Sequence, residues 1–205
     1  MFRLAPLVSL ALVVACGGSP SSPADKPADK PAAKPAEEKK EELRDRSQTP
    51  LVATKETIDG VSFTIDIPTA GFKRETNERD KYVNWTTSDG NPFIEPSITA
   101  KLYPPMMAPR DLEAFARSAI PAGQDKSEMV VARKEELPDG GMIVVVERSD
   151  SQFFKVEAHH RNGDKIVRCS VIQRTGTGKP DDKPIPNYAA TRAWAEKICT
   201  SIKIE

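Results

Sequence analysis

Proline recurs at every fourth position from residue 23 to residue 35, and this spacing limits which part of the chain can fold. The intervening residues are Ala-Asp-Lys or Ala-Ala-Lys. Proline removes backbone donors and favours the extended polyproline II conformation, and the segment has too few apolar side chains to offset the entropy cost of ordering. We therefore expect residues 16–50 to be a disordered spacer, or else a segment that binds cell wall. Residues 51–205 are then expected to form a single globular domain.

The N-terminus carries a short apolar run that ends in a cysteine. Arg3 supplies a positive charge, and about 12 mostly apolar residues up to Ala15 follow, as in a secretory signal peptide. A permanent membrane span would need roughly 20 apolar residues. The motif Val13-Val14-Ala15-Cys16 resembles the lipobox of bacterial lipoproteins, whose cysteine thiol accepts a diacylglyceryl group. The resemblance implies that residues 1–15 are a cleaved signal peptide and that Cys16 carries lipid. An ordinary signal peptide followed by a chance cysteine is the alternative.

The implied lipid on Cys16 would hold the protein at a membrane. Each buried methylene contributes roughly 0.8 kcal/mol, and two or more acyl chains, such as palmitate, give stable anchoring. In many bacteria with two membranes, an aspartate after the lipidated cysteine retains a lipoprotein at the inner membrane. Gly17 occupies that position, so the resemblance implies the cell outer membrane. We therefore expect a lipid-anchored protein of the cell envelope, on its periplasmic or surface face.

The charges of the expected domain are nearly balanced. Residues 51–205 contain 22 Lys and Arg and 23 Asp and Glu. This balance gives no electrostatic argument for binding nucleic acid or anionic lipid. We therefore expect no nucleic-acid partner.

Several segments of the domain have the patterns of β-strands. Apolar and polar residues alternate from 61 to 67, and the Asp59-Gly60 turn before them predicts a hairpin with residues 51–57. Residues 142–146 are almost all β-branched, which is typical of a strand buried on both faces. Asn162-Gly163 predicts a tight hairpin between two later strands. Further strands are expected at residues 82–87, 97–103, 127–136, 152–160 and 165–172.

Two helices are expected between and after these strands. The first has Pro109 in its first turn, and its apolar face consists of Leu112, Phe115, Ala116 and Ala119. The second starts at Asn187 as N-cap, and its inward stripe consists of Thr191, Trp194, Ala195, Ile198 and Ile202. The order of strands, helix, four strands and helix predicts an α+β fold, a mostly antiparallel sheet with packed helices.

Two cysteines remain once Cys16 is assigned to lipid. Cys169 lies on an expected strand and Cys199 on the last helix. In an exported chain we expect them to form a disulfide, although two buried free thiols are the alternative. Closing a loop of about 30 residues would stabilise the domain by roughly 3–4 kcal/mol on the chain-entropy model.

The domain resembles a known family at both of its ends. Residues 60–72, Gly-Val-Ser-Phe-Thr-Ile-Asp-Ile-Pro-Thr-Ala-Gly-Phe, look like the opening strand and turn of PsbP-like α/β/α sandwich domains. These domains often close with a helix that ends in a cysteine and a short aliphatic strand, and residues 197–204 are similar. The resemblance implies a small non-enzymatic module, because no shared catalytic residues exist to carry over, and it supports fold more than function.

No group of residues in the sequence indicates a catalytic or metal-binding site. His159 and His160 are neighbours on a strand, so they point to opposite faces and cannot easily share a metal. One is expected at the surface and one in the core, and we expect no metal, no cofactor and no catalytic residue. Met106 and Met107 could be soft-metal ligands or an exposed apolar contact, but ordinary packing under the helix start is the favoured interpretation.

Three hypotheses for function follow. The first is a non-enzymatic binding or assembly accessory, held in the envelope by lipid, with an envelope protein as partner. The second is a lipoprotein that binds a small apolar ligand between sheet and helices. An envelope enzyme ranks last, since two histidines on one strand offer no support for nucleophilic catalysis.

Overall fold

The computed structural model describes residues 43–88, 95–121, 128–175 and 182–205, all within one compact unit. Cys16, with the rest of the predicted lipobox, and the proline repeats lie outside these residues, so the structure does not test those predictions. In chain order the elements are β1 (Leu51–Ile58), β2 (Val61–Pro68), β3 (Phe72–Asn77), β4 (Tyr82–Thr87), β5 (Ser97–Leu102), the 3-10 helix η1 (Pro105–Met107), α1 (Leu112–Ala119), β6 (Met129–Glu136), β7 (Met142–Arg148), β8 (Phe153–Asn162), β9 (Lys165–Arg174), α2 (Tyr188–Thr200) and β10 (Lys203–Ile204).

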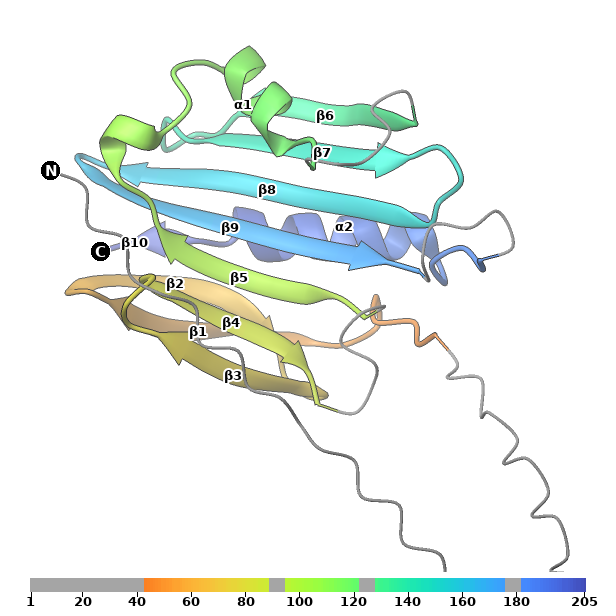
Figure 1. The fold of residues 1–205 in the computed structure, drawn as a ribbon. Helices are drawn as coiled ribbons and strands as arrows, with labels where there is room; N and C mark the ends of the chain where they lie inside the picture. The colour runs from red at the N-terminus through yellow and green to blue at the C-terminus, as the bar shows by residue number, and fades with distance from the viewer. Residues whose placement is uncertain (1–42, 89–94, 122–127, 176–181) are drawn as a thin grey trace, which may run out of the picture. The chain divides into compact units, whose positions relative to one another are not determined.

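The strands form two antiparallel sheets. One has seven strands in the order β3-β4-β5-β9-β8-β7-β6, and the other has three in the order β1-β2-β10. With two α-helices, this confirms the predicted mostly antiparallel sheet with packed helices. Figure 1 shows α1 on the near side of the larger sheet, over β6 and β7, and α2 on its far side, behind β8 and β9.

The main core fills the space between the larger sheet and a layer made of the small sheet and α2. Its largest buried members include Phe63 and Ile65 from β2, Phe154 from β8 and Ile198 from α2. The β1–β2 hairpin has the predicted register, with Ile58 opposite Val61. This side of the larger sheet is called the inner face below.

The opposite side, here called the outer face, carries a smaller core under α1. Phe115 and Ala119 of α1 pack on Val144 and Val146 of β7. Ile143 and Val145 of the same strand belong to the main core. The prediction that residues 142–146 are buried on both faces is therefore confirmed.

Both helix starts differ in detail from the predictions. Asp111 caps α1 by accepting a hydrogen bond from the backbone N–H of Ala114 at 2.7 Å, so Pro109 lies before the helix rather than in its first turn. Asn187 is the N-cap of α2 as predicted, but with φ of 46° its side chain makes no cap hydrogen bond. That side chain donates instead to Asp45.

Packing of the domain extends upstream of residue 51. Arg46 is buried, its Nε lies 2.9 Å from Glu95 Oε2, and its guanidinium lies 5.7 Å from the centre of the Phe72 ring. Residues from 43 onward thus contribute contacts to the domain, although the sequence pattern placed residues 16–50 in the spacer.

Candidate functional site

The two neighbouring histidines occupy opposite faces of β8, as their alternation predicts. Both are buried, however, so the expectation that one lies at the surface is wrong. His160 faces the inner side, where its Nε2 donates to the Cys199 carbonyl at 2.6 Å and its Nδ1 lies 2.8 Å from Asp139 Oδ2. This histidine joins the end of α2 to the β6–β7 turn and has a structural role.

His159 faces the outer side and lies between two aromatic rings. Its ring centre is 5.0 Å from that of Tyr103 and 4.4 Å from that of Phe115. The side chain is only 5% exposed, and neither ring nitrogen has a hydrogen-bond partner within the described part of the chain. Burial of an unpartnered polar group is costly, so such a group calls for an explanation.

A group of charged and polar side chains surrounds His159 on the outer face. We define the His159 cluster as Lys155, Glu157, His159, Arg168 and Ser170. Glu157 Oε1 lies 2.8 Å from Arg168 Nη2 and 3.8 Å from His159 Nε2, and its other oxygen pairs with Lys155. Lys155 Nζ also donates to the Ala119 carbonyl at the end of α1. The buried carboxylate is therefore held by two cations.

The surroundings of His159 favour the neutral imidazole. Burial lowers the pKa of His159 from 6.5 to about 4. The negative charge of Glu157 acts in the opposite direction, while the positive charge of Arg168 adds to the lowering. At neutral pH the ring is therefore uncharged, with one donor and one acceptor nitrogen.

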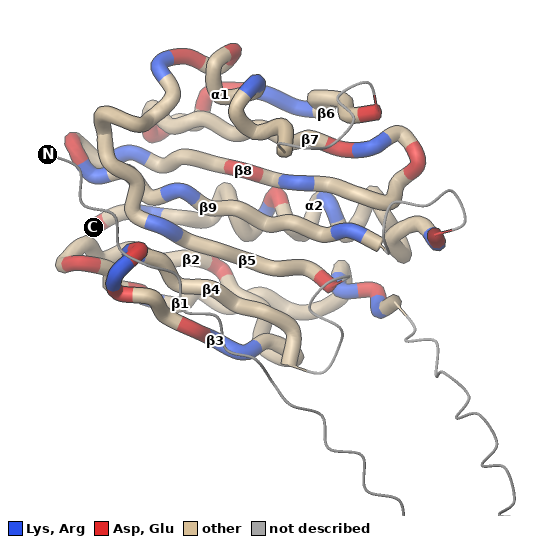
Figure 2. The backbone as a smooth tube through the Cα atoms, in the orientation of Figure 1, with Lys and Arg blue, Asp and Glu red and all other residues tan. Residues whose placement is uncertain are grey.

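Strand register places the cluster in rows across the outer face. Arg168 of β9 lies opposite His159 of β8 on one side and opposite Lys101 of β5 on the other. One row away, Ser170 lies between Glu157 and Thr99. Figure 2 shows basic residues along β5, β9 and β8, in the part of the larger sheet that α1 does not overlie.

An apolar projection lies at one end of this face. Met106 is 93% exposed and Met107 is 63% exposed, both on η1. The favoured interpretation, packing under the helix start, is therefore wrong. Tyr103, just before η1, packs against His159 at a tilt and has the Arg168 guanidinium 5.5 Å from its ring centre.

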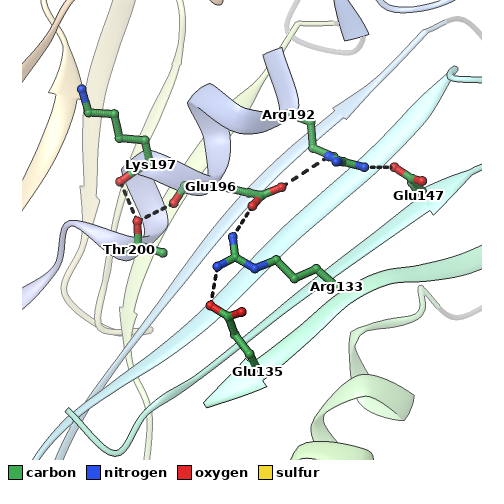
Figure 3. Close-up of polar contacts among 7 residues, drawn as sticks. All are labelled: Arg133, Glu135, Glu147, Arg192, Glu196, Lys197 and Thr200. Atoms are coloured by element: carbon green, nitrogen blue, oxygen red, sulfur yellow. Dashed lines mark hydrogen bonds and ion pairs between the residues drawn. The ribbon is translucent and has the colours of Figure 1, made fainter. Parts of the chain in front are cut away.

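A second polar network lies on the inner side, where α2 meets the edge of the sheet (Figure 3). Arg133 of β6 pairs with Glu135 and with Glu196 of α2. Arg192 Nη1 lies 2.6 Å from Glu147 Oε2, which also accepts a hydrogen bond from the Tyr188 hydroxyl. Burial, and then this hydrogen bond, raise the pKa of Tyr188. The network orients α2 on β6 and β7 and leaves no carboxylate without a cation.

Two open grooves lie at strand ends rather than between sheet and helices. The larger, of about 480 Å³, lies between the ends of β1 and β3 and is mostly polar, with Arg74 and Tyr82 in its wall. The smaller, of about 270 Å³, lies beside η1 and includes Leu102, Tyr103 and Ile166. Neither matches the position expected for an apolar ligand between sheet and helices.

Cys169 and Cys199 pair as predicted. The sulfur atoms of Cys169 on β9 and Cys199 on α2 lie 2.08 Å apart, at disulfide distance. Within the four described ranges, no group of three or more His, Cys, Asp and Glu side chains is arranged to hold a metal ion. None of the helices described there is long and apolar enough to cross a membrane.

Comparison with known proteins gives no family assignment. The chain matches no protein-family model and no curated protein. The arguments that follow therefore depend on the residues themselves.

Proposed function

We propose that this chain is a lipid-anchored protein of the bacterial cell envelope whose domain binds another protein without catalysing a reaction. The anchor is supported by Val13-Val14-Ala15-Cys16 and the charged, apolar segment before it. Gly17 after the cysteine favours the outer membrane, and the proline repeats suit a spacer between lipid and domain.

The exposure of Met106 and Met107 carries the binding part of the proposal. These side chains project from a short 3-10 helix next to Pro104 and Pro105, so their backbone is restrained before any partner arrives. Burying one such side chain gains roughly 1.5–3 kcal/mol, and a restrained backbone loses little entropy on binding. Methionine also adapts its shape to a partner surface.

Three side chains that could serve nucleophilic catalysis, Cys169, Cys199 and His160, are engaged in structural contacts. Cys169 and Cys199 lie at disulfide distance, and His160 bridges α2 and Asp139. His159 lies between two rings without a nucleophile as hydrogen-bond partner among the described residues. These contacts favour a binding role over an enzymatic one.

The order of elements supports a PsbP-like α/β/α sandwich. β2 includes most of residues 60–72, which look like the opening strand of that family, and α2 ends at Cys199 and Thr200 before the short strand β10. The two α-helices lie on opposite faces of the larger sheet. In that family such domains are non-enzymatic modules, which agrees with the proposed role.

Site-specific photo-crosslinking in intact cells tests the binding surface. A photoreactive residue at position 106 or 107 is expected to give one discrete protein adduct. Val52, an apolar residue of β1 that is 51% exposed, is the matched control position and is expected to give none. A lack of adducts from both methionine positions, or the same adducts from position 52, would contradict the proposal.

Fatty-acid labelling tests the anchor separately. The wild-type chain is expected to incorporate labelled palmitate, and the Cys16→Ala variant is expected to lose the label and the membrane attachment. Label that persists in the variant would rule out lipidation at Cys16.

A further inference from the structure

We infer that the outer face carries a binding site for a phosphate group, formed by Arg168, Lys101 and Ser170 beside His159. This inference is independent of the protein contact proposed at η1, and only its lipid test uses the anchor proposed at Cys16. It depends on the register of β8, β9 and β5, on the charges in that register and on polar atoms left without partners.

The cations of the site exceed its anions. Arg168 and Lys101 are direct cross-strand neighbours, and Arg161 lies one row further along β8. Glu157 is the acid of the cluster, and Lys155 already pairs with it. In the described ranges no ion-pair partner contacts Lys101 or Arg161. Two like charges on adjacent strands repel each other, and an anion bound between them would remove that repulsion.

Arg168 retains hydrogen-bonding capacity for an anion. Its Nη2 binds Glu157, and 28% of the side chain is exposed, so the guanidinium can be reached from solvent. The Tyr103 ring, 5.5 Å away, restrains the guanidinium plane. A restrained guanidinium that offers further N–H donors is well suited to phosphate oxygens.

Ser170 supplies a hydroxyl at the same place. Its Oγ is buried without a partner among described residues. The neighbouring Thr99 hydroxyl is already used, because it donates to Asn84 Oδ1 at 2.9 Å. Lys101 and Arg168 lie directly opposite each other, about 4.5–5.5 Å apart at Cβ, and Ser170 is a diagonal neighbour of Lys101 at about 7–8 Å. The two long cationic side chains can therefore hold a tetrahedral group beside Ser170. Phosphate satisfies more of these donors than a planar carboxylate does.

His159 gives a second, independent indication of a ligand. It lies in the same row as Arg168 and Lys101, is about 95% buried in its side chain, and neither of its nitrogens is satisfied. The elements packed around it present Glu157, Lys155 and Arg161 from β8, Arg168 from β9 and the rings of Phe115 and Tyr103. His160, on the other face of β8, also acts on the ring. An anion bound beside Arg168 would offset the positive charge of Arg168, which disfavours protonation of the His159 ring.

Titration of the mature, lipidated chain with inorganic phosphate tests the site by NMR. Saturable shifts are expected at the amides of Arg168 and Ser170. Because proton and anion binding are reciprocal, the pKa of His159 is expected to rise from about 4 at saturating phosphate. No saturable shift, or a shift without any change in His159, would overturn the inference.

Two variants and a control separate this role from a structural one. Lys101→Gln breaks no ion pair seen in the described residues and is expected to weaken phosphate binding about tenfold. Arg168→Lys keeps a charge for Glu157 but removes the guanidinium, and is expected to weaken binding as well. Lys197→Gln, on the exposed side of α2, is the control and is expected to bind as wild type. Equal binding by all three would contradict the assignment.

The source of the phosphate is identified in the same experiment. The anchored protein is placed in nanodiscs of phosphatidylglycerol or of phosphatidylcholine. Both lipids contain a phosphate, but the choline of phosphatidylcholine neutralises its charge. Shifts at Ser170 in phosphatidylglycerol, and weaker shifts in phosphatidylcholine, before any phosphate is added would support an anionic lipid headgroup as ligand. Shifts that require added phosphate would support a soluble ligand, and shifts in neither case would overturn the site.

Discussion

Acid should destabilise this domain through one histidine. His159 is neutral and buried in the folded state, with a pKa of about 4, whereas an unfolded chain has the ordinary value of 6.5. As pH falls below 6.5 the unfolded state takes up a proton that the folded state does not. Stability therefore decreases from about pH 6.5 to about pH 4. At 1.36 kcal/mol per pH unit, the total loss is about 3 kcal/mol.

A His159→Phe variant isolates this contribution. Phenylalanine keeps an aromatic ring between Tyr103 and Phe115 but removes both unpartnered nitrogens. The free energy of unfolding is measured with urea at pH 7, 6, 5 and 4, with the disulfide intact. The wild type is expected to lose about 3 kcal/mol more than the variant between pH 7 and pH 4. The other ionisable side chains are common to both proteins, so the difference between the two curves isolates the contribution of His159. Equal pH dependence in the two proteins would refute the reasoning.

Three further variants test the packing of the domain by denaturation at pH 7. Replacing both Cys169 and Cys199 by alanine should cost about 3–4 kcal/mol, because the bond closes a 30-residue separation; an unchanged midpoint would argue against the bond. Arg46→Ala should lower the free energy of unfolding by about 3 kcal/mol, since it leaves Glu95 buried without this cation. A loss below 1 kcal/mol would mean that residues before 51 contribute little to the stability of the domain. Gly141→Ala should lower the free energy of unfolding by at least about 2 kcal/mol, because an added Cβ would lie 2.0 Å from the His159 carbonyl oxygen. An unchanged stability would contradict that close approach.

Local patterns were sufficient to predict most of the fold. The apolar run at residues 142–146 correctly predicted a strand buried on both faces, because each face of β7 packs on its own core. Asn162-Gly163 gave the β8–β9 hairpin, with Gly163 at φ of 59°. β3 was not predicted, because four of its six side chains are exposed and the strand is held mainly by pairing with β4.

The candidate site depends on contacts that local patterns do not specify. The predicted hairpin at Asn162-Gly163 was enough to place His159 opposite Arg168, since the turn fixes the register of the two strands. The pairing of β5 with β9, which brings Lys101 to Arg168, joins segments more than 60 residues apart in the sequence. The exposure of Met106 also could not be predicted, because it depends on where η1 leaves the sheet.

Native mass spectrometry of the protein released gently from its own membrane tests the central claim most directly. The proposal predicts a chain that starts at Cys16, carries lipid and retains one protein partner. The same chain with Met106→Ser and Met107→Ser is expected to keep the lipid and lose the partner. A lipidated monomer without a protein partner, or a partner that survives both substitutions, would contradict the proposed binding role of η1.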